Sequence, residues 1–412
     1  MRVTIFHSHF GGMAGAEILL LAQSRWLLAA GHEVRIAVFH SSSADCSEAF
    51  SGIPIDEIGM PPGFRRMERV PLALMPRLVA AAAPVLARSD IVMAYNYPAA
   101  PVTAAALSAP HRRLWYACEP YRALHLRDGN PVAVSRLDQR SGQVEDEASR
   151  QVRRRLLRRR WLHALVPGTA RHERELQSWD ASGVRALDAV TALSAYSAMC
   201  VAKATGRTDC SVIHPMVNFT PESAVPRRRG LRREAPEILL HSRLSSPKNI
   251  DTVLRAFALV RRAHRAAVLH IVGSGERHRM LASLASRLDL GDAVRFHGFL
   301  SRDDIDTISA RCDVFVFAPV DEPFGMVFPE AAARGLLLVG SDHGGPREIL
   351  EDGGIGELCD AFRAESVAEA IHRTFALSDA DADTRRARAD VSVRTRFGHE
   401  TVGRLLEAFL RG

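Results

Sequence analysis

The sequence predicts an α/β protein built from two doubly wound domains of parallel β-sheet. Three observations favour this class: the chain has 412 residues, short β-type runs alternate with longer helical patterns, and the alternation restarts in the second half. At roughly 100 to 200 residues per domain, this length exceeds one ordinary core. Strand–helix–strand spacing builds parallel sheets with crossover helices, whose ligands bind beyond the carboxyl ends of the strands. We therefore expect two such domains facing a cleft.

The first half supplies the first expected sheet. A helical pattern over 16–30 closes at Gly31, a residue type that ends helices well. Residues 70–87 are the most membrane-like stretch, but three prolines and Arg77 interrupt them. A spanning helix wants about 20 mainly apolar residues, so we expect a helix packed on the sheet instead. The strand-like runs cover 2–8, 33–40, 90–96, 112–118 and 188–194.

In the second half, the alternation of strands and helices starts again after a non-periodic segment. Residues 214–237 are rich in proline and charge and poor in periodicity, which indicates a linker. Beyond them, the expected helices cover 249–264, 276–288 and 302–312. The expected strands cover 237–243, 266–273, 293–299, 313–319 and 336–340.

Composition excludes several classes of protein. The chain is 47% hydrophobic and 25% charged, as globular proteins are. Its six cysteines form no Cys-x-x-Cys pair, so neither a zinc site nor a disulfide framework is indicated, and a reducing, cytoplasmic setting is expected. The N-terminus lacks the pattern of a secretory signal. The net charge of +7 is concentrated in stretches such as 150–160, without any nucleic-acid-binding motif, so we expect no nucleic-acid partner.

Charged side chains follow two strand-like runs of the second half. Arg243 and Lys248 lie in the loop after the run 237–243, and two cations there suit a diphosphate. Glu322 and Glu330 follow the run 313–319 and can bind opposite ends of one ligand, because carboxylates accept hydrogen bonds from adjacent hydroxyls. Gly325, between them, lets backbone approach a ligand closely. Taken alone, a solvated loop explains the two cations equally well.

These residues belong to a set of motifs that resembles the second domain of the retaining glycosyltransferases of family four. The resemblance covers 236 to about 360 and follows the family's order. It implies the GT-B architecture, in which two Rossmann-like domains face a cleft. The motifs are SRLSSPKNID (242–251), IVGSGE (271–276), FHGFLSRDD (296–304), DEPFGMVFPEAAARG (321–335) and SDHGGPREIL (341–350).

The resemblance implies a role for each residue. Arg243 and Lys248 would hold the diphosphate of a nucleotide-sugar donor, and Glu330 its ribose hydroxyls. Glu322 would grip the transferred sugar, together with backbone amides of the turn that follows it. Arg243, Lys248 and Glu322 are therefore the expected catalytic residues. The backbone contacts are expected at Phe324, Gly325 and Met326 for the sugar and β-phosphate, and at Phe299 and Leu300 for the nucleobase.

The first half resembles the family less closely. The glycine loop HFGGMAGAE (9–17) matches the family's opening loop, so Gly12 is expected near the sugar donor. In the segment 114–124, Cys118 stands where mannosyltransferase-like members carry His, which puts a catalytic imidazole in doubt unless His125 supplies one. Glu119 and Arg122 keep the pattern and are expected on the acceptor side.

The implied activity is metal-independent, retaining transfer of a hexosyl-type sugar, with no cofactor. The segment 187–218 favours GDP-mannose slightly over a UDP-sugar, whereas the acceptor, a glycan, a lipid-linked glycan or a natural product, and the oligomeric state are open. The run 150–160 is either a solvated helix face or a contact for an anionic membrane, which would make the chain peripheral on the inner face. The Asp-x-Asp pattern at Asp304 and Asp306 is interpreted as coincidence, and so is the acidic pattern over 379–383; no metal is expected.

Two other functions use the same residues. A GT-B sugar-nucleotide epimerase would rearrange its substrate without an acceptor. A non-catalytic, membrane-associated nucleotide-sugar-binding protein would use 150–160 as its anchor. The expected organisation is an acceptor domain over 1–215, a linker over 216–235, a sugar-donor domain over 236–395 and a helix over 396–412 that resembles the family's last helix and returns to the first domain.

Overall fold

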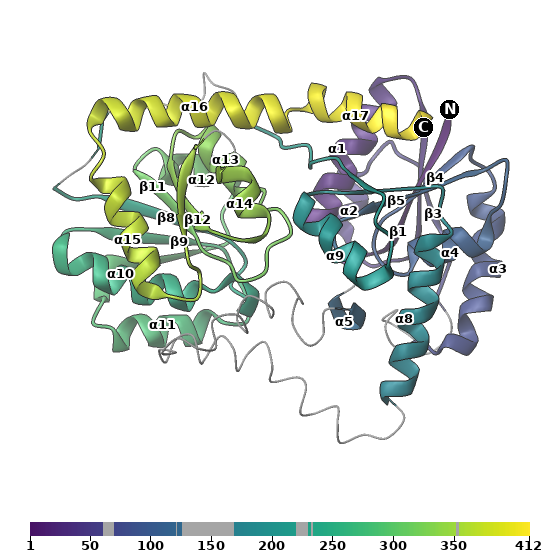
Figure 1. Cartoon of the computed structure of the whole chain (residues 1–412), viewed down its shortest axis with the longest axis horizontal. Coiled ribbons are helices and arrows are strands. Elements are labelled where there is room, and N and C mark those ends of the chain that lie inside the picture. The colour runs from purple at the N-terminus through teal and green to yellow at the C-terminus, as the bar shows by residue number, and fades with distance from the viewer. Residues whose placement is uncertain (61–69, 121, 126–168, 220–229, 232–233, 352–353) are drawn as a thin grey trace. The chain divides into compact units, whose positions relative to one another are not determined.

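A computed structural model describes most of the chain as two compact units. The first contains residues up to 125 together with 169–216 and 399–412, and the second contains 217–398 (Figure 1). The basic run at 150–160 lies outside the described residues. These are 1–60, 70–120, 122–125, 169–219, 230–231, 234–351 and 354–412.

The first unit is built on a seven-stranded sheet in the order β3-β2-β1-β4-β5-β6-β7. Every strand pair described in it is parallel. β1 pairs with β2 on one side and β4 on the other, and the strand order reverses there, so the loops at the carboxyl ends of β1 and β4 diverge. The strands are β1 Arg2–Phe10, β2 Glu33–Ser41, β3 Ile55–Glu57, β4 Ile91–Ala94, β5 Arg112–Ala117, β6 Ala189–Ala192 and β7 Cys210–Val212.

The membrane-like stretch of the first unit forms an amphipathic helix. The stretch 70–87 forms the short helix η2 and then α3, which buries Met75, Leu78, Ala82 and Leu86, spaced as a helix requires. No helix in the described part of the chain has the length and apolar character needed to cross a bilayer. The helices are α1 Gly15–Ala29, α2 Ala44–Ala49, η2 Leu72–Leu74, α3 Met75–Leu86, α4 Ala99–Ala106, α5 Arg122–His125, α8 Thr169–Arg185, α9 Ala195–Thr205 and α17 His399–Arg411.

The last helix of the chain, α17, packs against α1 within the first unit. Gly403 faces the ring of Trp26 so closely that any Cβ at this position would overlap the indole. The indole Nε1 donates a hydrogen bond to Glu407 Oε1 at 3.1 Å. A residue as small as glycine is therefore needed where the two helices meet.

The second unit has a six-stranded sheet in the order β10-β9-β8-β11-β12-β13. Its described pairs are parallel as well, and the strand order reverses between β8 and β11. The predicted fold class, two doubly wound parallel sheets, is confirmed. The strands are β8 Glu237–His241, β9 Val268–Val272, β10 Val294–Gly298, β11 Val314–Phe317, β12 Leu337–Ser341 and β13 Gly356–Cys359.

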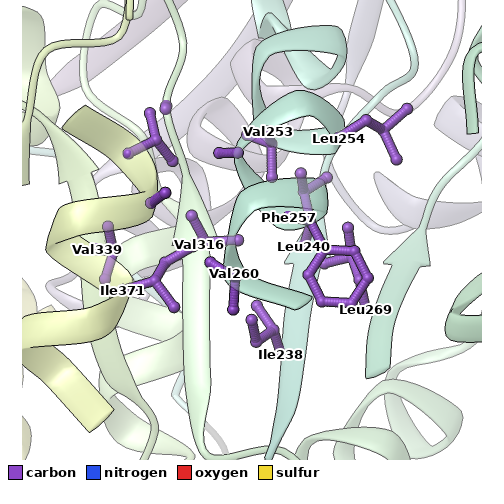
Figure 2. Packing of buried hydrophobic residues seen from close by; sticks show 14 of the residues in the cluster. Ile238, Leu240, Val253, Leu254, Phe257, Val260, Leu269, Val316, Val339 and Ile371 are labelled. Carbon is purple, nitrogen blue, oxygen red and sulfur yellow. The ribbon is translucent and has the colours of Figure 1, made fainter. Parts of the chain in front are cut away.

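The core of the second unit fills the space between the sheet and its helices. In Figure 2, Val253, Phe257 and Val260 of α10 lie against Ile238 and Leu240 of β8. Burial of each such side chain contributes about 1.5–3 kcal/mol, so the sheet that carries the loops is held rigidly. The helices are η4 Ser246–Lys248, α10 Ile250–Ala263, α11 His278–Arg287, η5 Gly291–Ala293, α12 Arg302–Ser309, α13 Val327–Ala333, α14 Gly344–Glu351, α15 Ala364–Phe375 and α16 Asp379–Phe397.

Candidate functional site

The loop after β8 carries the two predicted cations. Arg243 is exposed, and Lys248 ends the short helix η4. A second loop, from the IVGSGE motif, supports this one: Leu244 N donates to Ser274 O at 2.9 Å. Gly273 and Gly275 are required there, because a Cβ at either would overlap the carbonyl oxygens of the β8 loop. The glycines of this motif thus position the loop of the two cations.

The loop after β11 is held by side chains from neighbouring loops. Asn249 Nδ2 donates to Ala318 O at 2.9 Å. Ser341 Oγ donates to Pro319 O at 2.6 Å, and His343 Nε2 donates to Val320 O at 3.0 Å. Three consecutive carbonyls that would otherwise need water are satisfied in this way, and the loop leading to Glu322 is fixed. The sequence analysis did not single out Asn249, Ser341 or His343 for this role.

Glycines also shape the turn that contains Glu322. Gly345 N donates to Glu322 O at 2.9 Å, and a Cβ on Gly345 would overlap the backbone of Phe324. Gly325 has φ +96°, a left-handed conformation that L side chains rarely adopt. The close approach of the SDHGGPREIL motif to DEPFGMVF therefore depends on both glycines.

The structure brings Lys248 and Glu322 into direct contact. Lys248 Nζ lies 2.6 Å from Glu322 Oε2, with 23% and 12% of the two side chains exposed. The same ammonium lies 5.8 Å from the centre of the Phe317 ring, where the aromatic face attracts a cation. The two residues predicted to bind different parts of one ligand thus form an ion pair with each other.

Glu330, on α13, belongs to a separate set of charges that includes Arg334 and Asp306 of α12. Its Oε2 lies 3.9 Å from a guanidinium nitrogen of Arg334, and Arg334 Nε donates to Asp306 Oδ1 at 2.6 Å. Burial raises the pKa of Glu330 above its usual value, although the charges of Arg334 and Arg302 act in the opposite direction. Asp306, interpreted from sequence as coincidental, therefore holds the arginine beside Glu330.

Phe299 and Leu300 follow β10, one edge strand of the second sheet. The Phe299 side chain is 84% exposed. Gly298 O accepts a hydrogen bond from Gly273 N at 2.7 Å, which links this loop to the one that supports the cations. The predicted nucleobase contacts therefore lie in a loop at the same carboxyl edge of the sheet as Arg243.

His241 is a buried titratable group close to the predicted cations. It ends β8, two residues before Arg243. Burial, together with the positive charge of Arg334, lowers its pKa to about 4. The imidazole is therefore neutral at physiological pH and leaves the positive charge of the loop to Arg243 and Lys248.

In the first unit, Gly12 lies in the loop between β1 and α1. Apart from its chain neighbours, no described residue has a heavy atom within 4 Å of the place where the Gly12 Cβ would be. Nearby, His7 Nε2 and Glu17 Oε1 are 3.2 Å apart, and Glu17 Oε2 accepts from Ala14 N at 3.2 Å. Burial alone would raise the pKa of Glu17, but the hydrogen bond and charge of His7, together with hydrogen bonds from the backbone, outweigh it and lower the pKa. No motif or spacing in the sequence indicated this buried pair.

The residues predicted on the acceptor side follow β5. Glu119 lies next to Cys118, whose pKa is raised to about 12 by burial and by the negative charge of Glu119. The thiol is therefore neutral and does not replace an imidazole as a base. His125 Nε2 is 2.6 Å from Asp180 Oδ2, and the two side chains are 4% and 7% exposed. Arg122 belongs to α5, but its side chain lies outside the described residues.

The remaining carboxylates of the two acidic patterns make structural contacts. Ser301 caps α12 by accepting from Asp304 N at 3.2 Å, and its hydroxyl donates to Asp304 Oδ2 at 2.6 Å. Asp379 and Asp383 accept from backbone amides of Leu231 and Gly230, at 3.3 Å and 3.2 Å. Asp304 thus takes part in the N-terminal cap of α12, and Asp379 and Asp383 hold the end of the predicted linker on α16.

Comparison with known proteins identifies relatives of this arrangement. The sequence profile of the family described as glycosyl transferases group 1 matches residues 223–390. The GDP-mannose-dependent alpha-(1-6)-phosphatidylinositol monomannoside mannosyltransferase of Mycobacterium tuberculosis is 31% identical over 240 residues, which cover 55% of this chain and 62% of that protein. The lipopolysaccharide core biosynthesis glycosyltransferase LpsE of Rhizobium meliloti is 32% identical over 172 residues, or 41% of this chain and 45% of that protein. The chain thus matches about half the length of these relatives.

A solved structure extends the likeness to the whole chain. The crystal structure of Anabaena HepE in complex with UDP and glucose matches with a TM-score of 0.67 and 20% identity, and the match covers 99% of both chains. At this identity the likeness shows the fold alone, which is the GT-B fold.

Proposed function

We propose that this chain, whose residues 223–390 match the family described as glycosyl transferases group 1, transfers a sugar from a nucleoside diphosphate to an acceptor with retention of configuration. The observation that carries the proposal is the ion pair of Lys248 and Glu322, 2.6 Å apart, beside the exposed Arg243. Two cations and a carboxylate at the carboxyl edge of a doubly wound sheet suit a diphosphate with an attached sugar. The loops that carry them are fixed by hydrogen bonds from neighbouring side chains and backbone, which is the preorganisation that catalysis needs.

Each charged group has a distinct part in the proposed reaction. Arg243 and Lys248 bind the diphosphate and stabilise the negative charge that develops on it as the sugar leaves. Glu322 accepts hydrogen bonds from sugar hydroxyls, and the backbone amides of Phe324, Gly325 and Met326 contact the β-phosphate. Glu330 accepts hydrogen bonds from the ribose. The leaving group is stabilised by these residues, and a metal ion is not required for the step.

For the sugar donor we propose GDP-mannose ahead of a UDP-sugar. The mycobacterial relative is named as GDP-mannose-dependent, which supports this choice, and its named acceptor is a phosphatidylinositol mannoside. The Anabaena structure contains UDP and glucose, so a UDP-sugar is our second choice. An acceptor attached to a lipid or to a growing glycan is consistent with both named relatives, and we assign it to the first unit, which carries Glu119.

A nucleotide panel tests the proposed sugar-donor site. Wild type, Arg243→Ala and the control Arg262→Ala are titrated calorimetrically with GDP, UDP, ADP and TDP. Arg262 is exposed in the last turn of α10 and therefore lies towards the opposite edge of the sheet. We expect one diphosphate, GDP first, to bind wild type and the control, and binding to fall at least about tenfold in Arg243→Ala. Binding by none of the four nucleotides would refute the site.

Product analysis separates transfer from the two other functions. With GDP-mannose and a lipid-linked acceptor, transfer yields GDP and a glycosylated acceptor. An epimerase would convert the sugar donor without any acceptor, and a binding protein would leave it unchanged. Conversion that does not depend on the acceptor would therefore overturn the proposal while leaving the nucleotide site intact.

A further inference from the structure

A cluster of three potential metal ligands lies at the opposite end of the second sheet from the proposed sugar-donor site. Glu237 is the first residue of β8, His270 lies in the middle of β9, and Cys312 comes just before β11. Their exposed fractions are 8%, 2% and 3%. One ligand atom from each lies within 4.8 Å of those of the other two. The cluster is therefore buried and compact, and it is separate from the loops after β8 and β11.

Strand order brings these residues together. Leu239 pairs with His270 between β8 and β9, so Glu237, two positions earlier in β8, presents its side chain on the same face. The other face of β8 belongs to the core through Ile238 and Leu240. The turn before β11 is tied to β8 because Asp313 N donates to Glu237 O at 2.8 Å. The three ligand groups are thus held by rigid backbone.

The chemistry of the group suits a divalent transition metal. A carboxylate oxygen, an imidazole nitrogen and a sulfur are the atoms that coordinate Zn²⁺ in proteins. His270 Nε2 lies 2.8 Å from Glu237 Oε2, so both atoms can contact one ion after a small adjustment. The other ring nitrogen, Nδ1, lies 2.9 Å from His297 Nε2. A hydrogen bond at that position orients a metal-bound histidine and fixes its tautomer.

The hydrogen bond between Glu237 and His270 forms without an ion, and the buried sulfur of Cys312 lies within 4.8 Å of both ligand atoms. Arg311 is 3.5 Å from Glu237 Oε1, and its side chain is 54% exposed, so this guanidinium can turn into solvent when a cation binds.

We propose that Glu237, His270 and Cys312 bind one zinc-type divalent ion with a structural role. The ion would join β8, β9 and the turn before β11, and water would complete its tetrahedral shell. It takes no part in sugar transfer, because the proposed transfer residues follow the opposite ends of the strands. The proposal is therefore independent of the proposed function and compatible with a metal-independent reaction.

Cobalt titration of the full chain tests the proposal. The protein is dialysed against a chelator to remove bound metal, the chelator is then removed, and the protein is titrated with Co²⁺. A bond between Co²⁺ and a thiolate gives a charge-transfer absorption band. We expect one equivalent of Co²⁺, a thiolate band and displacement by Zn²⁺. Cys312→Ser should abolish the band. Cys359→Ser should keep it, and it is a matched control because Cys359 is also a buried thiol at a strand of the same sheet.

Several results would overturn the metal site. The first is that wild type shows no thiolate band, and the second is that the band persists in Cys312→Ser. The third is that Zn²⁺ raises the melting temperatures of wild type and Cys312→Ser equally. If Cys312→Ser does not fold, Glu237→Gln replaces it, since its amide can still bond to His270. We expect that variant to bind Co²⁺ at least about tenfold more weakly, and unchanged affinity would show a hydrogen-bonded pair without a metal.

Discussion

Because Lys248 and Glu322 form an ion pair, we expect one substitution to change the affinities for two ligands in opposite directions: the free nucleoside diphosphate and the intact sugar donor. Lys248 cannot bind a diphosphate fully while its ammonium lies 2.6 Å from Glu322. The substitution Glu322→Gln removes this competition. It should therefore strengthen the binding of a nucleoside diphosphate that has no sugar. The same substitution should weaken the binding of the intact sugar donor, because the proposed acceptor of the sugar's hydrogen bonds loses its charge.

The size of the effect follows from the burial of the pair. Exposed ion pairs contribute about 0.2–1 kcal/mol, and breaking a fully buried pair costs about 3–5 kcal/mol. With 23% and 12% of the side chains exposed, this pair lies between the two cases. We expect about 1–2 kcal/mol, which corresponds to roughly five- to thirtyfold tighter binding of the diphosphate.

A double-mutant cycle isolates this contribution. Wild type, Lys248→Met, Glu322→Gln and the double variant are titrated calorimetrically with GDP and with GDP-mannose. The gain from Glu322→Gln should largely disappear in the Lys248→Met background, because only repulsion between the carboxylate and the phosphates then remains. If Glu322→Gln weakens GDP and GDP-mannose equally, Glu322 does not restrain Lys248, and the reasoning fails.

Three further predictions concern other contacts. Gly403→Ala places a Cβ inside the Trp26 indole and should lower the free energy of unfolding by about 1–3 kcal/mol in urea; an unchanged midpoint would contradict the packing of α17 on α1. Folding lowers the pKa of His241 from 6.5 to about 4, so between these pH values the folded chain binds fewer protons than the unfolded chain. The contribution of His241 to the free energy of unfolding should therefore be fully present above pH 6.5 and fall by about 2–3 kcal/mol towards pH 4. The pH profile of His241→Gln should be flatter. Arg334→Met removes a charge that lowers the pKa of Glu330, so the loss of donor affinity on acidification should begin at a higher pH than in wild type, and superimposable profiles would contradict this role.

The sheets could be predicted from sequence because buried parallel strands are nearly continuous apolar runs. β11, with the sequence VFVF, is fully buried and stands out in the chain. β3, β7 and β13 were not predicted as separate strands, since each has only three or four residues of mixed polarity. Such short edge strands are defined by their pairing partner, and pairing depends on the fold of the whole domain.

The sequence indicates which residues form the candidate site, but not which of them contact one another. The positions of Arg243, Lys248 and Glu322 after strand-like runs indicate one edge of a sheet. That Lys248 contacts Glu322 depends on β8 and β11 being neighbours, and the order of strands cannot be read from the spacing of motifs. The supporting bonds from Asn249 and His343 are missed for the same reason, because they join loops that follow different strands.

The cluster at the other end of the second sheet extends this argument to metal sites. Zinc was not expected because no two cysteines show a Cys-x-x-Cys spacing, a rule that detects ligands carried by one loop. Glu237, His270 and Cys312 come from three segments, and adjacent strands bring them together. The strand neighbours that place Lys248 beside Glu322 at one edge also place a carboxylate, an imidazole and a thiol together towards the other edge. A cobalt band that depends on Cys312 would therefore identify a kind of site for which local spacing gives no signal.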